Sequence, residues 1–408
     1  MKFNFFSSKT ILVSIGLVSL AIANLAWADD TRGVNSQTSQ YVRENKIDGI
    51  IETYYRANDL PGMSVAIIRK GEMIYRKGFG WADREEKEPA RAETVYSIGS
   101  VSKPIGATLA VKLENEGRLR DGATFSLDLS LPTSDYLTDI PNANGRGRVS
   151  LPTFHTHTVK QLLSHTGCVA GSSGKTTPGI VNRTTHYATA ISAVQSMWDT
   201  GLVTKTAWAD NGPCAIGKTW SYSTPAFTFI AAALESATGR NIDRLLQEEL
   251  LAPHGLSGIR IKYASPVLTP DHDRATPYDK DNRKLDFEDD SWRALGGGME
   301  AHALDLARFG WKLLDGEILS EDVRDNRLWR RVEISNTNSP GYALGWGVTT
   351  DAHGRRIAEH PGMATGGRAL LHIYRDHGLV IAILANRKEH PVGDVHVLAG
   401  NIGDEILR

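Results

Sequence analysis

Ser100 and Lys103 stand three residues apart in the run YSIGSVSKPIGATL, which spans residues 96–109. The pattern after Val101 predicts a helix that begins there, and residues three apart in a helix lie one turn apart on one face. Pro104 is compatible with a first helical turn, where its missing N–H has no acceptor. A serine hydroxyl beside an amine, at a helix N-terminus whose free N–H groups favour negative charge, indicates a nucleophile with an adjacent base.

The Ser-x-x-Lys spacing alone is not specific, because a second copy occurs at Ser172 and Lys175. That copy lies in GSSGK, a Gly/Ser-rich loop with no helical pattern to orient it. An acyl-transfer site also needs a residue that moves the proton and donors that hold the oxyanion. The further candidates are Tyr222 in WSYSTPAF and His360 in EHPGMATGG.

The two ends of the chain carry short β-prone runs, and the middle carries helical patterns. Strands are expected at 63–69, 72–77, 342–349, 355–359, 368–374 and 379–386, with helices at 41–57 and 395–407. Further helices are expected at 158–165, 186–199, 225–238 and 241–252. The order predicts an α/β (α+β) fold in a single domain, residues 29–408. Its antiparallel sheet is built from about 41–104 and 300–408, flanked by helices, and a mostly helical insert occupies about 105–299.

The chain of 408 residues is 41% hydrophobic, which suffices for a sizeable core, and its formal net charge of −1 favours neither nucleic acid nor an anionic membrane as partner. Residues 1–28 have two lysines, an apolar run at 11–25 and Ala26-Trp27-Ala28, the pattern of a cleaved signal peptide. The apolar run is shorter than the roughly 20 residues of a membrane-spanning helix. We therefore expect export across the inner membrane, a periplasmic location and no stable membrane span after cleavage.

Cys168 and Cys214 are the two cysteines of the chain. An even pair in an exported protein is a candidate disulfide, and the alternative is two buried free thiols. His155, His157 and His165 have no matching cysteine or carboxylate cluster, so we expect no metal site. His165 is expected to cap or orient the helix near Cys168.

Taken in order, these motifs resemble the serine β-lactamase and penicillin-binding superfamily, in its class C β-lactamase, D-Ala-D-Ala carboxypeptidase and related esterase branch. The resemblance extends over about 370 residues, and it includes the surroundings of Ser100 and several further sequence runs. These are TVKQLLSHTG at 158–167, GKTWSYS at 217–223, ALGGGMEAHALDLARF at 294–309 and GYALGWGV at 341–348. The resemblance implies that Ser100 is acylated, that Lys103 is its partner and that Tyr222 shuttles the proton.

The third motif of the family, usually Lys-Thr-Gly or His-Thr-Gly on an edge strand, matches His360-Pro361-Gly362. The resemblance implies that Gly362 lets the substrate approach the strand and that the N–H groups of Ser100 and Met363 form the oxyanion hole. His360 would then polarise the proton network or face a substrate carboxylate.

Two positions depart from the family pattern. Thr224 stands where an asparagine usually contacts the amide of the substrate, and Pro361 replaces the usual threonine. Threonine has no NH₂ donor, and proline lacks both a hydroxyl and a backbone N–H. Both changes disfavour efficient β-lactam hydrolysis and fit a peptidase of different specificity or an esterase.

The sequence therefore predicts a periplasmic serine hydrolase that uses an acyl-enzyme and neither metal nor organic cofactor. Its expected partner is a small-molecule or peptide substrate, with D-amino-acid peptides or β-lactams ranked first and small esters second. A hypothesis of another class is a non-catalytic penicillin-binding or sensor protein. The complete set of Ser100, Lys103 and Tyr222 argues against it, because a pure binder needs no proton shuttle.

Overall fold

The computed structural model describes residues 34–170, 185–203, 214–263, 274–334 and 341–408. The predicted signal peptide and the second Ser-x-x-Lys at Ser172 and Lys175 lie outside these ranges. The chain divides into the compact units Met1–Val42 and Arg43–Arg408, and the sheet and the helical region both belong to the second unit. In the described part of the chain, no helix has the length and apolar content that crossing a membrane requires.

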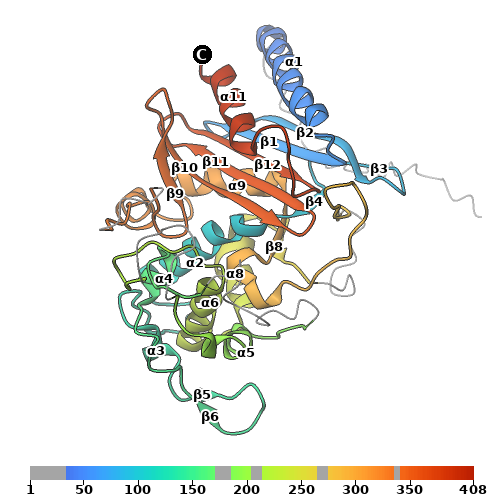
Figure 1. Ribbon diagram of the computed structural model, residues 1–408. Coiled ribbons are helices and arrows are strands. Elements are labelled where there is room, and N and C mark those ends of the chain that lie inside the picture. Colours follow the sequence, from blue (N-terminus) through green and yellow to red (C-terminus); the bar gives the residue numbers. More distant parts are fainter. Residues whose placement is uncertain (1–33, 171–184, 204–213, 264–273, 335–340) are drawn as a thin grey trace, which may run out of the picture. The chain divides into compact units, whose positions relative to one another are not determined.

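An antiparallel sheet joins the two ends of the second unit (Figure 1). Its strands, in spatial order, are β3 (Glu88–Pro89), β2 (Glu72–Asp83), β1 (Gly62–Arg69), β12 (Leu379–Ala385), β11 (Gly367–Tyr374), β10 (Arg356–Ala364) and β9 (Gly347–Thr350). β1 lies between its hairpin partner β2 and the distant β12, with Met63 opposite Ala385 and Arg69 opposite Leu379. The predicted sheet from N- and C-terminal segments is confirmed.

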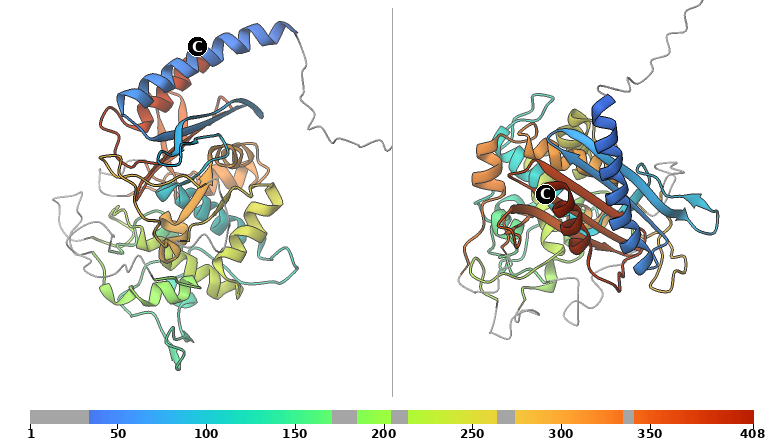
Figure 2. Two further views of the ribbon diagram at one scale, coloured as in Figure 1. Left: turned by 90° about the vertical axis from the view of Figure 1, so that its right-hand side faces the viewer. Right: turned by 90° about the horizontal axis from the view of Figure 1, so that it is seen from above.

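Helices cover both faces of this sheet, which explains why β1 and β12 are almost continuously apolar. On one face, the part of α1 (Val34–Ala57) that belongs to the second unit and α11 (Val395–Leu407) pack against the sheet through residues such as Ile51 and Leu398 (Figure 2). On the other face lies α9 (Ala303–Leu314), which leads into the larger core shared with the helical region. The sheet is therefore a buried layer between helices.

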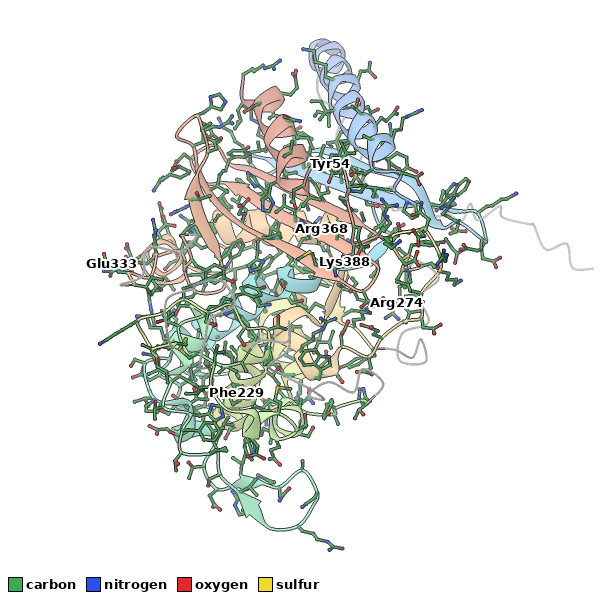
Figure 3. All side chains as sticks on the ribbon, in the orientation of Figure 1. Tyr54, Phe229, Arg274, Glu333, Arg368 and Lys388 are labelled. Carbon is green, nitrogen blue, oxygen red and sulfur yellow. A yellow bond between two sulfur atoms is a disulfide. The ribbon has the colours of Figure 1, made fainter. Side chains whose placement is uncertain are left out.

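The helical region follows α2 (Ser102–Glu116) and returns to the sheet through α9. Its other helices are α3 (Thr133–Tyr136), α4 (Val159–Leu163), α5 (Ala190–Gln195), α6 (Pro225–Thr238), α7 (Ile242–Leu245) and α8 (Ala294–Gly297), and α10 (Glu321–Val323) follows α9. The small sheets are β4 (Val95–Ser97), β8 (Met299–His302) and β7 (Ile259–Ile261), and β5 (Ile140–Pro141) with β6 (Arg148–Val149). Figure 3 shows Phe229 of α6 in this region and Arg368 of β11 on the sheet.

Several boundaries differ from the sequence prediction. The helix expected at 186–199 is shorter, because Thr189 caps α5 and the chain leaves the α-helix after Gln195. The strand expected at 342–349 is reduced to β9, because Gly341 and Gly345 have φ angles of +76° and +72° and a turn separates them from the strand. In contrast, the strand expected at 355–359 continues to Ala364 as β10.

Candidate active site

Ser100 and Lys103 lie where the chain enters α2. Ser100 is in a 3-10 turn, Gly99–Val101, and Lys103 is in the first turn of the helix that follows. Lys103 Nζ is 3.2 Å from Ser100 Oγ, as the spacing of the two residues predicts. Ser100 is partly exposed, whereas Lys103 has no exposed surface, so the hydroxyl can meet a substrate while the amine is shielded from water.

Lys103 has two further neighbours, both of which accept its N–H groups. Nζ donates to the backbone carbonyl of Gly296 in α8 and lies 3.2 Å from Thr224 Oγ1. Burial and the positive charge of Arg293 hold the pKa of the Lys103 amine well below its usual value. A neutral amine has two N–H groups and one lone pair. With Gly296 and Thr224 taking the N–H groups, the lone pair is left for the Ser100 hydroxyl.

Tyr222 reaches Ser100 from the segment that precedes α6. Its phenol hydrogen-bonds with the Ser100 hydroxyl, and Lys103 Nζ lies 4.7 Å from the centroid of its ring. Burial raises the pKa of Tyr222 above its usual value of 10, and the hydrogen bond with Ser100 offsets only part of that rise. The phenol therefore carries its proton at neutral pH and is suited to donate it.

His360 lies on β10, buried and close to the same group of residues. Its Nδ1 is 2.6 Å from the carbonyl oxygen of Pro361, and its Nε2 is 2.9 Å from the hydroxyl of Tyr342. A carbonyl only accepts, so Nδ1 carries the proton, and Nε2 accepts from Tyr342. Burial and the nearby Lys103 lower the pKa of His360 to about 3. His360 is a neutral imidazole with both nitrogens engaged inside the protein.

The backbones of β10 and the Ser100 turn approach each other closely, which explains two glycines. A Cβ on Gly362 would lie 1.9 Å from the carbonyl oxygen of Ile98, and one on Gly99 would lie 2.4 Å from that of Met363. The backbone of Met363 is thus against Gly99, one residue before Ser100, while its side chain is 53% exposed. β9 pairs with β10 only up to Glu359, so the residues of β10 after Glu359 pair with β11 on one side and not with β9 on the other.

Thr224, which the sequence predicts to contact the substrate, is buried, and its hydroxyl lies 3.2 Å from Lys103 Nζ. Pro225 starts α6 directly after it, so the start of this helix lies against Lys103. The Thr224 hydroxyl is therefore placed to orient the amine.

Cys168 and Cys214 form a disulfide with a Cα–Cα distance of 5.8 Å. The bridge joins the chain just after α4 to the segment that leads to Tyr222.

His155 and His157 are 3.0 Å apart, from Nδ1 to Nε2, and within the described ranges no group of three His, Cys, Asp or Glu residues is arranged to hold a metal ion.

A family model described as "Beta-lactamase" matches residues 47–400, which include every residue of the site. The chain belongs to the β-lactamase family. It is 22% identical to penicillin-binding protein 4* of Bacillus subtilis over 364 residues, covering 85% of this chain and 73% of that protein. It is 26% identical to esterase EstB of Burkholderia gladioli over 232 residues, covering 56% of this chain and 54% of EstB, about half its length.

The fold of this β-lactamase family member matches that of a class C β-lactamase from Rhodobacter sphaeroides. The TM-score is 0.67 and the sequence identity is 18%, with 89% of this chain and 100% of the other covered. The match confirms the predicted β-lactamase/transpeptidase-like fold, and the chain is a serine hydrolase of the β-lactamase and penicillin-binding family.

Sequence reasoning missed Tyr342, which lies in the quoted run GYALGWGV but was given no role. Its ring lies 5.0 Å from that of His165 and 5.9 Å from that of Trp220, in an aromatic wall beside Tyr222. Burial, with the neighbouring Tyr222, raises the pKa of Tyr342 well above its usual value, so it remains a proton donor to His360. The only sequence signal was a tyrosine between glycines just before the sheet.

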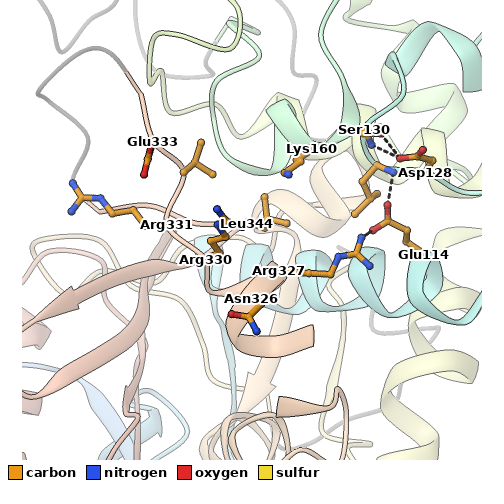
Figure 4. A pocket seen from close by; sticks show the side chains of 12 residues that line it. Glu114, Asp128, Ser130, Lys160, Asn326, Arg327, Arg330, Arg331, Glu333 and Leu344 are labelled. Carbon is orange, nitrogen blue, oxygen red and sulfur yellow. Dashed lines mark hydrogen bonds and ion pairs between the residues drawn. The ribbon is translucent and has the colours of Figure 1, made fainter. Parts of the chain in front are cut away.

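A separate pocket of about 520 Å³ lies between α2, the start of α4 and the segment after α10. Figure 4 shows Lys160, Arg330 and Leu344 on its walls, and Arg327 paired with Glu114 at one end. None of the predicted site residues lines this pocket. The pocket is therefore distinct from the candidate site at Ser100.

Proposed function

We propose that this protein is a serine acyl hydrolase that forms an acyl-enzyme on Ser100 and acts on small neutral substrates, esters before amides. The observation that carries the proposal is the buried Lys103 amine, 3.2 Å from Ser100 Oγ, with two further acceptors for its N–H groups. A base beside a serine hydroxyl at a helix start is the arrangement that nucleophilic acyl transfer needs.

In the proposed reaction, Ser100 Oγ bonds to the substrate carbonyl carbon while Lys103 Nζ takes the hydroxyl proton. The carbonyl oxygen becomes the oxyanion, held by the N–H groups of Ser100 and Met363. Collapse breaks the bond to the leaving group, which receives a proton from Tyr222, and the lysine ammonium restores the proton of the phenol. Water, deprotonated by the same amine, then attacks the carbonyl of the acyl-enzyme, and the resulting ammonium returns the proton to Ser100 Oγ as the acid is released. The high pKa of Tyr222 supports its role as proton donor and favours Lys103 as the acylation base.

The charges around the site support a neutral substrate. D-Ala-D-Ala peptides and most β-lactams present a carboxylate close to the scissile bond, and such a group needs a cation or a set of donors. His360 is neutral with both nitrogens engaged, and Arg293 pairs with Asp290 at 2.6 Å. Pro361 offers no hydroxyl. This reverses the ranking from the sequence and puts esters first.

Amide bonds of D-amino-acid peptides or β-lactams are the second candidate, and the edge of β10 favours peptides. Beyond Glu359 this strand has no partner from β9, and an extended peptide can pair with such an edge. Penicillin-binding protein 4* and the class C β-lactamase are relatives whose names point to the same substrates.

We also propose that the protein is exported to the periplasm. The signal-like residues 1–28 and the Cys168–Cys214 disulfide support this location, because disulfides persist in oxidising compartments. Edman sequencing of protein recovered from the periplasmic fraction tests it. A sequence starting near Asp29 is expected, and an intact N-terminus in the cytosolic fraction would refute it.

The substrate test uses the mature protein and a Ser100→Ala variant with three probes: a p-nitrophenyl ester, a D-Ala-D-Ala peptide and a chromogenic β-lactam. We expect turnover of the ester by the wild type and none by the variant, with a transient acyl adduct on the Ser100 peptide by mass spectrometry. Turnover by the variant would refute the mechanism. A stable adduct without turnover would identify the non-catalytic sensor, and turnover of the peptide alone would favour the second candidate.

A further inference from the structure

His165 lies two residues after α4, adopts a left-handed conformation and is almost completely buried. Its φ angle is +59°, a region that residues other than glycine adopt uncommonly, although asparagine, aspartate and histidine are enriched there. Only 1% of its surface is exposed, and the mechanism above gives it no role.

His165 contacts the chain on both sides of Tyr222. Its backbone carbonyl accepts the N–H of Ser221 at 2.7 Å, and its Nδ1 accepts the N–H of Ser223 at 3.2 Å. The imidazole also lies against the phenol ring, with 4.3 Å between the ring centroids. One residue therefore fixes both neighbours of Tyr222 and one face of its ring.

These contacts require a neutral imidazole. Nδ1 must present its lone pair to the Ser223 N–H, so the proton is on Nε2, for which the described part of the chain offers no hydrogen-bond partner. Protonation would turn Nδ1 into a donor facing another donor. Burial, together with Lys103 and His360, lowers the pKa of His165 well below its usual value and keeps this acceptor in place.

We infer that His165 is a positioning residue for Tyr222: its carbonyl and its Nδ1 hold residues 221 and 223 so that the phenol reaches Ser100. The inference rests on the proposed function, in which Tyr222 delivers the proton to the leaving group. It goes beyond the expectation that His165 orients its own helix, because the contacts that carry it are to the segment of Tyr222.

The left-handed conformation suggests a matched pair of variants. Asparagine and glycine both tolerate positive φ, but only asparagine has an acceptor, Oδ1, at the same position along the side chain as Nδ1. Comparison of His165→Asn with His165→Gly therefore isolates the hydrogen bond to Ser223 from backbone strain. His157→Ala is the control for loss of a buried histidine, because His157 bonds with Thr133 and lies outside the site.

We would measure kcat, KM and the melting temperature of each variant with p-nitrophenyl acetate. The glycine variant should lose at least about tenfold in kcat with KM changed less than about threefold, since a misplaced catalytic group lowers the rate more than binding. The asparagine variant should retain at least about a third of the wild-type kcat. His157→Ala should lower the melting temperature while kcat stays unchanged.

Equal kcat values for the asparagine and glycine variants would overturn the inference, as would a loss of kcat in His157→Ala that matches the loss in His165→Gly. If the glycine variant is recovered unfolded, His165→Leu takes its place: it fills the volume without an acceptor, and its added backbone strain at positive φ is read separately from the melting temperature. Turnover in Ser100→Ala would overturn the proposed function itself. Wild-type kcat in His165→Gly, with Ser100→Ala inactive, would overturn the positioning role alone.

Discussion

Removal of the Cys168–Cys214 disulfide should impair activity before it unfolds the protein. The bridge closes a loop with a sequence separation of 46, which corresponds to about 4 kcal/mol of stabilisation in the chain-entropy model. Because Cys214 lies at the start of the segment that leads to Tyr222, the bridge also tethers this segment next to the end of α4.

Without the bridge, the segment keeps three backbone donors bound near the end of α4. Gly217 N donates to Thr166 O at 2.8 Å, and Ser221 and Ser223 donate to His165. At about 1 kcal/mol net for each hydrogen bond, the three together give about 3 kcal/mol. Ordering of the segment costs about 1–2 kcal/mol of backbone entropy for each residue, so the segment should detach locally while the sheet and the main core persist.

The assay is a urea titration of the wild type and a Cys168→Ser/Cys214→Ser double variant, followed by esterase activity and by far-UV circular dichroism. In the wild type the two midpoints should coincide. In the double variant, and in the wild type after reduction and alkylation, the activity midpoint should fall well below the circular dichroism midpoint. Equal shifts of both midpoints would refute the local tether, and reduction of the double variant serves as the control for direct effects of the reductant.

Three further predictions follow from the site. Lys103→Met should lower kcat by about 10³-fold or more and raise stability at pH 7 by roughly 1–2 kcal/mol. In the wild type, folding lowers the pKa of Lys103, so below pH 10.5 the unfolded chain binds a proton that the folded chain does not, and this destabilises the fold. The stability gained by Lys103→Met should therefore vanish in thermal melts above pH 10.5, where the lysine is neutral in both states. In the pH profile of kcat/KM, the fall in rate at low pH should follow protonation of Lys103. His360→Asn should leave the pH of this fall unchanged, because the pKa of His360 is about 3. A fall that moves to another pH in the variant would contradict this assignment. Gly362→Ala should lower both kcat/KM and the melting temperature, because the new Cβ would lie 1.9 Å from Ile98 O. The matched control, Gly49→Ala, has open space around the new Cβ and should stabilise α1 by about 0.5–1 kcal/mol in a thermal melt.

The sheet could be predicted from sequence because its strands are apolar runs separated by recognisable turns. That both ends of the chain contribute to one sheet followed from the presence of such runs at both ends. The exact register, Met63 opposite Ala385, could not be predicted, because both faces of these strands are buried and alternation carries no information. The strand expected at 342–349 was wrong because the positive φ angles of Gly341 and Gly345 cannot be read from residue type alone.

Some residues of the site could be predicted from local sequence patterns, and others could be placed only from tertiary contacts. Ser100 and Lys103 are set by helical spacing, which sequence shows, and Tyr222 and His360 came from motif order. The hydroxyl of Thr224 could be assigned to Lys103 only once α6 and α2 were seen in contact. His165 and Tyr342 act through hydrogen bonds between segments far apart in the chain, and no local pattern reports such contacts.

The electrostatics of the site favour uncharged groups in the resting state. Burial lowers the pKa of Lys103 well below its usual value and that of His360 to about 3, and it raises the pKa of Tyr222. Attack by Ser100 therefore creates an oxyanion and a lysine ammonium together, and each charge stabilises the other beside the first turn of α2. A substrate carboxylate bound at this edge would favour the ammonium before the reaction starts, because an opposite charge raises the pKa of an amine. The base would then already hold a proton, which gives an electrostatic reason for this site to prefer neutral esters.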